Sequence, residues 1–230
     1  MPLQLGLARR IRRSLREAWH NRAPFRRLAP ASYEEYKATQ NEGNLRKLDM
    51  VFAIERNIAH LARYAKARPG LDPGAQLRIL CHGSRNGAEV RWFQQHAPGS
   101  QVLGTDIADT ATRFPDMIQW DFHELEPGWV RAWDVVYSNS WDHAFDPERA
   151  FGNWIRCLTL NGLLFLEHSR SHTPAYASKL DPFGAQLASL CTMLDRVGAP
   201  TGHAVIEVID DLPEPADQRK VVVVGRRSQA

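Results

Sequence analysis

The chain has 230 residues, of which 43% are hydrophobic and 24% are charged. This length and composition are typical of one globular domain with a small extension, and they exclude wholesale disorder, a collagen and a coiled coil. No apolar run approaches the roughly 18 residues of a membrane span, and no signal peptide is apparent. The three scattered cysteines, Cys81, Cys157 and Cys191, argue against a disulfide scaffold and favour a reducing compartment, so we expect a cytoplasmic protein.

The first thirty residues carry the excess of positive over negative charge. They contain eight arginines and one acid, so the remainder of the chain is mildly acidic although the whole has a net charge of +3. This distribution argues against nucleic acid as a partner. The segment is predicted to be a basic amphipathic helix, because apolar residues recur every four positions at Leu3, Leu7, Ile11, Leu15 and Trp19. Residues 3–20 are expected to lie peripherally on an anionic membrane or an acidic partner, or to pack on their own domain or on a second subunit.

A helical segment is predicted for residues 31–74. Ser32 and Glu35 have the spacing of a capping box, which marks a helix start. Residues 41–44, Asn-Glu-Gly-Asn, predict a break between two helices, and Pro-Gly pairs at 69–70 and 73–74 mark a boundary. The sequence therefore divides into an arm (1–30), a helical lid or extension (31–74) and a main domain (75–230).

Strand-like and helical segments alternate from residue 77 onward, which predicts an α/β fold with a parallel, doubly wound sheet. Only a short loop joins the last two strands, so these are expected to pair antiparallel. Helices are expected near 87–97, 147–159 and 184–197. The seven predicted strands are Leu77–Cys81, Gln101–Ile107, Met117–Trp120, Trp133–Ser138, Gly162–His168, Ala204–Asp210 and Lys220–Gly225.

Ligands of such sheets bind beyond the carboxyl ends of the strands. The first strand is followed by two glycines, Gly83 and Gly87, spaced Gly-x-x-x-Gly, which does not match the dinucleotide fingerprint. Asp106 ends the second strand, where a carboxylate can accept hydrogen bonds from ribose hydroxyls. Asp121 and Phe122 follow the third strand and can bind the amino group and the ring of an adenine.

These features resemble the class I, Rossmann-like S-adenosylmethionine-dependent methyltransferases, in particular bacterial enzymes that act on small molecules. The resemblance covers residues 75–226 and implies the strand order 3-2-1-4-5-7-6, with the seventh strand antiparallel. It also implies S-adenosylmethionine as the cofactor. The expected cofactor-binding residues are Gly83, Ser84, Arg85, Gly87, Asp106, Ile107, Asp121, Phe122, Ser138 and Asn139.

The sequence departs from the family pattern at two positions. The family usually has an acid where Cys81 stands and a glycine where Arg85 stands. The missing acid removes an indirect anchor for the methionine amine. The alternatives are that His82 or Arg85 replaces it, or that affinity for the cofactor is weak. Arg85 can alternatively pair with the methionine carboxylate, or lie in solvent.

His143 follows the fourth strand and is the candidate general base for a hydroxyl acceptor. No metal site is expected, because the other polar residues after the fourth and fifth strands are better explained as pocket lining. The predicted reaction is methyl transfer to a small molecule, with a hydroxyl of a sugar, glycan or secondary metabolite as the favoured acceptor. The alternatives are a non-catalytic binding or scaffold protein on a degenerate methyltransferase fold, and a nucleotide-sugar or dinucleotide oxidoreductase.

Overall fold

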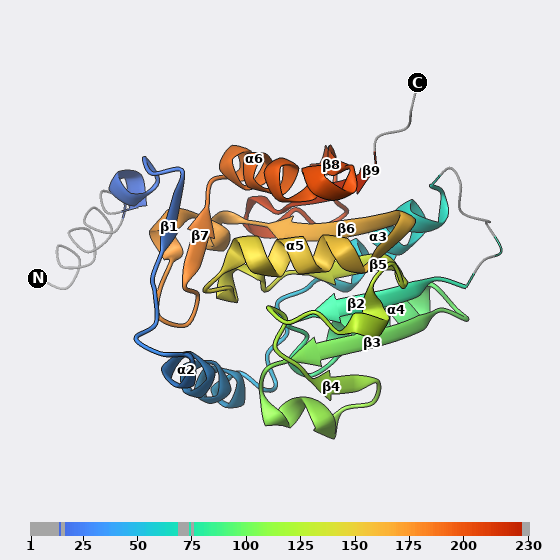
Figure 1. Ribbon diagram of the computed structural model, residues 1–230, viewed down its shortest axis with the longest axis horizontal. Helices are drawn as coiled ribbons and strands as arrows, with labels where there is room; N and C mark the ends of the chain where they lie inside the picture. Colours follow the sequence, from blue (N-terminus) through green and yellow to red (C-terminus); the bar gives the residue numbers. More distant parts are fainter. Residues whose placement is uncertain (1–13, 15–16, 69–73, 75, 227–230) are drawn as a thin grey trace, which may run out of the picture.

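A seven-stranded sheet forms the centre of the protein (Figure 1). The structure is a computed structural model that describes residues 14, 17–68, 74 and 76–226. The sheet order is β4-β3-β2-β5-β6-β9-β8. The strands are β2 (Arg78–His82), β3 (Gln101–Asp106), β4 (Met117–Gln119), β5 (Trp133–Ser138), β6 (Leu158–His168), β8 (His203–Ile209) and β9 (Lys220–Arg226).

The strand directions confirm the predicted fold class. Strands β2 to β6 pair in parallel, whereas β9 is antiparallel to both β6 and β8. Counted along the seven strands of this sheet, the order is 3-2-1-4-5-7-6. The loop between β8 and β9 is too short for a parallel crossover, and the hairpin is the result.

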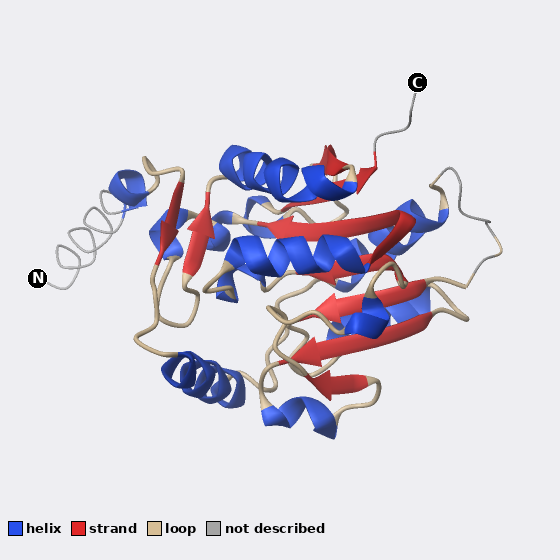
Figure 2. Ribbon diagram, in the orientation of Figure 1, coloured by secondary structure: helices blue, strands red, loops and turns tan. Residues whose placement is uncertain are grey.

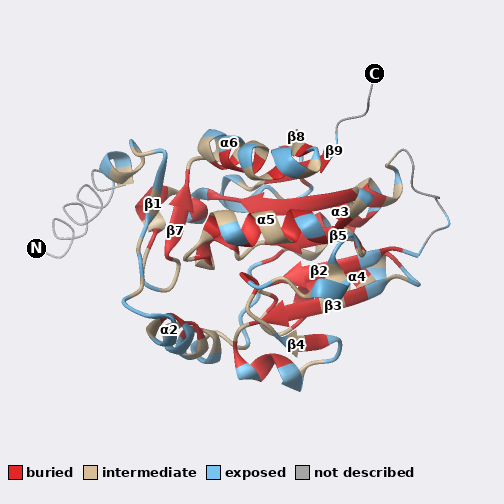
Figure 3. Ribbon diagram, in the orientation of Figure 1, coloured by how far each residue is buried: buried red, intermediate tan, exposed pale blue. Residues whose placement is uncertain are grey.

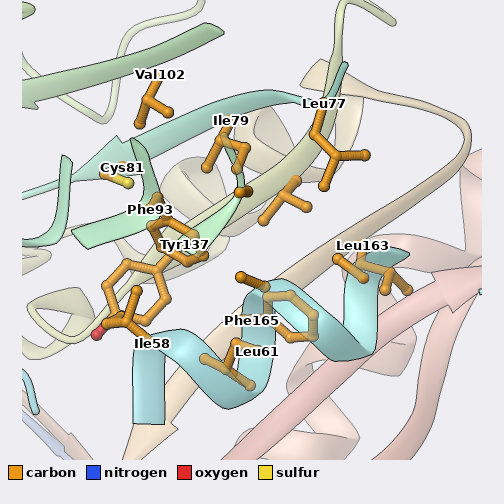
Figure 4. Packing of buried hydrophobic residues seen from close by; sticks show 14 of the residues in the cluster. Ile58, Leu61, Leu77, Ile79, Cys81, Phe93, Val102, Tyr137, Leu163 and Phe165 are labelled. Atoms are coloured by element: carbon orange, nitrogen blue, oxygen red, sulfur yellow. The ribbon is translucent and has the colours of Figure 1, made fainter. Parts of the chain in front are cut away.

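Helices cover both faces of the sheet (Figure 2). α3 (Glu55–Lys66) and α4 (Ala88–His96) pack on one face, while α5 (Pro147–Cys157) and α6 (Leu187–Gly198) pack on the other. Because both faces are covered, the central strands are almost entirely buried, as Figure 3 shows. Ile58 and Leu61 of α3 lie against the sheet in the same cluster as Tyr137 and Phe165 (Figure 4). α3 therefore belongs to the core layer, although it precedes the boundary expected at residue 74.

Helix α2 (Tyr33–Arg46) lies apart from these layers, near the carboxyl ends of β2 and β3 (Figure 1). The Ser32 hydroxyl accepts a hydrogen bond from the Glu35 N–H and caps the helix at the predicted place. The predicted break at residues 41–44 is wrong, because α2 is continuous through them. Gly43 is buried beneath Leu180, and flanking side chains of α2 bond to the main domain, so tertiary contacts outweigh the roughly 1 kcal/mol cost of a helical glycine.

Two element starts differ from the prediction, and two short strands were not predicted. β6 begins at Leu158 rather than Gly162, because Leu158 already pairs with Trp133 before a register shift. Residues 183–185 form a short strand, β7 (Phe183–Ala185), so α6 starts at Leu187 instead of residue 184. β7 pairs antiparallel with β1 (Phe25–Arg27), and neither strand was predicted.

The described end of the N-terminal segment is bonded to the main domain. Glu17 accepts a hydrogen bond from the Tyr176 hydroxyl, and Asn21 accepts one from the Ala175 N–H. Most of residues 3–20, for which a membrane or partner contact was predicted, lies outside the described residues. Within the part of the chain that is described, no helix is both long and apolar enough to span a membrane.

Candidate functional site

A cleft of about 470 Å³, partly open to solvent, lies at the carboxyl ends of β2, β3 and β5. One wall is the main domain and the other is α2, which crosses the strand ends. Parallel strands direct their following loops to this edge, which explains why the predicted site residues meet here. The lining residues are Tyr36, Gln40, Gly43, Asn44, Lys47, Gly83, Arg85, Asp106, Ile107, Phe122, Ser140, His143 and Leu180.

The loop after β2 forms the floor of the cleft. Gly83 has a φ of +74°, and a Cβ there would lie 2.7 Å from Ser140 Cβ, so only glycine fits without strain. Arg85 has a φ of +43°, the left-handed conformation that a glycine would take more easily. Its N–H donates to Asp106 Oδ2 at 3.0 Å. Arg85 thus keeps a backbone conformation that favours glycine, and the acid of the next strand holds it there.

The Asp106 carboxylate faces this cleft and is 7% exposed. Besides the Arg85 N–H, it accepts the Ala108 N–H at 3.0 Å. Oδ1 also accepts a hydrogen bond from Asn44 Nδ2 of α2 at 2.7 Å. Two backbone N–H groups therefore fix the carboxylate, and the Asn44 side chain of α2 uses part of its remaining capacity to accept hydrogen bonds.

Asp121 and Phe122 have different places. Phe122 lines the cleft with Ile107. The Asp121 carboxylate instead accepts hydrogen bonds from the His123 ring at 2.7 Å and from the Tyr33 hydroxyl at 3.0 Å. Burial opposes ionisation of Asp121, but the bonds from His123 outweigh it and hold the pKa of this carboxyl below its usual range. Asp121 is thus already engaged by its own chain and does not line the cleft.

Four more of the predicted residues lie around the floor of the cleft. Ser138 is fully buried and its hydroxyl donates to the backbone oxygen of His82, so it supports the loop from beneath. Gly87 caps α4 and lines neither cavity of this edge, whereas Asn139 lines a second cavity beside the first. Ser84 is buried, with its hydroxyl on the Cys81 carbonyl oxygen, and lines the same second cavity.

The second cavity, of about 230 Å³, shares Gly83, Arg85 and Ser140 with the cleft. Its outer wall is the exposed apolar segment 50–52, where the Arg85 guanidinium lies 5.1 Å from the Phe52 ring. Its inner wall includes Glu89, in the first turn of α4 and 5% exposed. Burial raises the pKa of the Glu89 carboxyl to about 7.

His143 lies at the end of the cleft where α2 and residues 180–181 meet. Its Nδ1 is 2.7 Å from Gln40 Oε1, and Gln40 Nε2 donates to the Leu180 carbonyl oxygen at 2.8 Å. The backbone acceptor sets the orientation of the Gln40 amide, so Nδ1 must carry the proton that Oε1 accepts. The second nitrogen, Nε2, is consequently the one available for proton transfer.

Two carboxylates face this nitrogen. Nε2 lies 3.4 Å from Asp181 Oδ1 and 4.0 Å from Asp142 Oδ1. Burial raises the pKa of Asp142 to about 7, although His143 opposes the change. Within the described chain, these three side chains are the group whose ligand atoms, all within 4.8 Å, are close enough to hold a metal ion.

Other histidines and the tryptophan near the strand ends are structural. His82 is 2% exposed, stacks on Trp154 at 4.9 Å and lines neither cavity, and burial lowers its pKa to about 3. Trp141 is fully buried between His168 and His172, with its N–H on the Glu167 carbonyl oxygen.

Comparison with known proteins agrees with this arrangement. No protein-family model and no curated protein sequence matches the chain. Many solved structures do. The 1,6-didemethyltoxoflavin-N1-methyltransferase of Burkholderia thailandensis, solved with S-adenosylhomocysteine, superposes with a TM-score of 0.62 at 14% identity over 88% of this chain and 94% of that one. The fold is that of the class I S-adenosylmethionine-dependent methyltransferases.

Two further structures define how far this likeness reaches. The plantazolicin methyltransferase BpumL, in complex with S-adenosylhomocysteine, has a TM-score of 0.58 at 11% identity, over 94% of this chain and 96% of that one. The [4+2]-cyclase SpnF has a TM-score of 0.60 at 12% identity, over 88% and 99%. Since a cyclase shares the fold, methyl transfer must be argued from the residues of the site.

Several cleft residues were missed by sequence reasoning. Gln40, Asn44 and Lys47 line the cleft from α2, and Glu89 lines the second cavity. The α2 residues recur every three or four positions with Tyr36, which places them on one helix face. That spacing was a usable signal, but the predicted break at residues 41–44 concealed it.

Proposed function

We propose that this protein transfers a methyl group from S-adenosylmethionine to a hydroxyl of a small molecule, such as a sugar, a glycan or a secondary metabolite. The observation that carries the proposal is the Asp106 carboxylate, held by two backbone N–H groups so that it faces a cleft at the strand ends. A carboxylate fixed in this way can accept both hydroxyls of a ribose.

The residues of the cleft suit the nucleoside part of that cofactor. Ile107 and Phe122 provide apolar surfaces beside Asp106 for a flat ring, and Gly83 lets a ligand approach the backbone closely. When bound, S-adenosylmethionine supplies an electrophilic methyl group for an in-line displacement. The chain has to orient the acceptor and exclude water, and α2, which forms one wall of the cleft, can contribute to both.

His143 is proposed as the general base. Its Nδ1 is held by Gln40, so Nε2 can take the proton of an acceptor hydroxyl, and Asp181 at 3.4 Å stabilises the imidazolium that forms. The preference for a hydroxyl acceptor follows from the presence of this base.

The first test is thermal unfolding with increasing S-adenosylhomocysteine, with NAD as the control ligand. At a hundredfold excess over the dissociation constant, binding stabilises the folded state by about 2.7 kcal/mol, which corresponds to a rise in Tm of about 5–10 °C. Asp106→Asn, which keeps the side-chain shape, should lose this rise. No rise in a folded wild type would favour the non-catalytic scaffold, and a rise with NAD alone would favour the oxidoreductase.

A further inference from the structure

Two charged side chains in the second cavity lack partners for part of their hydrogen-bonding capacity. No other residue that the structure describes donates a hydrogen bond to the Glu89 carboxyl or forms an ion pair with it, although this side chain is 5% exposed. Arg85 Nε is buried without an acceptor, while one terminal nitrogen donates to the Met50 carbonyl oxygen. Buried charged groups without partners are costly, so such a pair in one cavity indicates a ligand.

Glu89 lies near the end of β2, where the chain lacks the acid that the methyltransferase family usually has. Cys81 occupies that place, and the pKa of its thiol is raised by burial and further by the charge of Glu89. Glu89 lies in the first turn of α4, directly after the loop that follows β2, and lines the cavity together with Gly83 and Ser84 of that loop. α4 thus brings a carboxylate to the strand end where the strand itself provides none.

The second cavity adjoins the cleft, so one elongated ligand can occupy both. It shares Gly83, Arg85 and Ser140 with the cleft that contains Asp106, so a ligand bound there can continue past the Gly83 loop. An anion at Glu89 and a cation at Arg85 complement the two charges of an α-amino acid. A neutral or purely anionic group would leave one of the two side chains uncompensated.

We propose that Glu89 binds the α-ammonium group of the cofactor's amino-acid end, and that Arg85 binds its carboxylate. Glu89 is thereby the functional replacement, from a helix, for the acid missing at Cys81. This assignment rests on the proposed function, because it assumes that the nucleoside end of the same ligand lies at Asp106.

Calorimetric titration of the full chain with four ligands tests the assignment. These are S-adenosylhomocysteine, its analogue without the α-amino group, its decarboxylated analogue, and 5′-deoxy-5′-methylthioadenosine, which lacks the whole amino-acid end. Glu89→Gln should weaken binding of S-adenosylhomocysteine ten- to hundredfold and change the affinity for the deaminated analogue and for methylthioadenosine less than twofold. Arg85→Gln should weaken S-adenosylhomocysteine similarly and leave the decarboxylated analogue unaffected. Glu148→Gln, an exposed change on α5, is the matched control.

The outcomes separate this inference from the proposed function. If Glu89→Gln leaves S-adenosylhomocysteine binding unchanged, or weakens methylthioadenosine equally, the role of Glu89 is overturned while the nucleoside site stands. If the wild-type protein binds neither S-adenosylhomocysteine nor methylthioadenosine, the proposed function fails and the inference fails with it. Melting curves of the two variants without ligand establish that each is folded before its affinity is compared.

Discussion

At the scale of single residues, Glu89 links the site to the stability of the fold. Its carboxyl is buried in the folded chain, and burial raises its pKa to about 7 from an ordinary value of 4.5. Below pH 4.5 both the folded and the unfolded chain hold the proton. Between the two pKa values only the folded chain keeps it, so stability falls as pH rises, and above pH 7 the loss is complete. The separation of the two pKa values corresponds to a loss of about 3 kcal/mol.

Glu89→Gln should therefore stabilise the protein without ligand in a pH-dependent way. Glutamine cannot ionise, so the variant avoids the loss and should exceed wild type by about 2–3 kcal/mol at pH 8. The two proteins should converge near pH 4.5. Urea unfolding at the two pH values measures the difference. An equal difference at both pH values would mean that the substitution acts through packing and not through the charge of Glu89.

His143 is the residue on which the chemical step depends. A hydroxylated acceptor is first identified by screening compounds for release of S-adenosylhomocysteine. With this acceptor, His143→Gln should lower kcat by about 10²- to 10⁴-fold, the usual contribution of a general base. Binding of S-adenosylhomocysteine should change little. Gln40→Leu, which removes the acceptor for Nδ1, should lower kcat less because the imidazole remains. Unchanged kcat in His143→Gln would refute the base, and loss of wild-type activity with a chelator would instead implicate a metal ion at Asp142, His143 and Asp181.

The sequence located this site better than it described the partners of each side chain. Asp106, Gly83 and His143 were predicted as site residues, and all three line the cleft. They were predictable because short apolar runs mark the strands, and the loops after parallel strands lie at one edge of the sheet. Asp121 does not line the cleft, since its engagement by Tyr33 and His123 depends on contacts between distant segments. Glu89 was overlooked because an acid in the first turn of a helix is common for electrostatic reasons alone.

At the scale of elements, α2 is held over the cleft by bonds to the groups that a cofactor would use. Asn44 Nδ2 donates to Asp106 Oδ1 at 2.7 Å, in competition with a ribose hydroxyl. Asn44→Ala should therefore tighten binding of S-adenosylhomocysteine about three- to tenfold, because this bond no longer has to be exchanged. Calorimetry with Glu42→Ala, an exposed change on the same helix, provides the control. Weaker binding would show that Asn44 contacts the ligand instead.

The elements themselves were largely predictable, and the errors have one physical origin. Buried strands and amphipathic helices carry their signal locally, so the seven strands of the main sheet and the helices α4, α5 and α6 were recognised. The error at α2 arose because local turn signals at residues 41–44 are overridden by burial of Gly43 against Leu180. β1 and β7 were missed because each has three residues and exists only through its pairing with the other.

At the scale of the whole molecule, this small sheet joins the N-terminal segment to the second half of the main domain. The Leu28 N–H donates to the Pro182 carbonyl oxygen, and the Gln186 N–H donates to that of Pro24, so the pairing continues at both ends of the two strands. Asp181, which faces His143, lies two residues before the start of β7. The N-terminal segment therefore supports one wall of the cleft although it lies far from the site in sequence.

Two glycine substitutions test this support. At Gly184, in the middle of β7, a Cβ would lie 2.6 Å from the Thr173 carbonyl oxygen and 3.0 Å from Pro174 Cα. These are backbone atoms that cannot turn aside, so Gly184→Ala should lower the free energy of unfolding by about 1–3 kcal/mol. At Gly152, inside α5, a Cβ meets nothing within 4 Å, and Gly152→Ala should stabilise the protein by about 0.5–1 kcal/mol through helix propensity alone.

Cofactor and acceptor steps should respond differently to the same pair of variants. Strain at Gly184 acts next to Asp181 and the His143 end of the cleft, whereas Asp106 is held by its own loop and that of β2. Gly184→Ala should thus lower kcat and leave S-adenosylhomocysteine affinity within about twofold, and Gly152→Ala should change neither, as measured by urea unfolding, calorimetry and turnover. If Gly184→Ala were as stable as Gly152→Ala, the β1–β7 sheet would not brace the site, because the domain would tolerate displacement of β7.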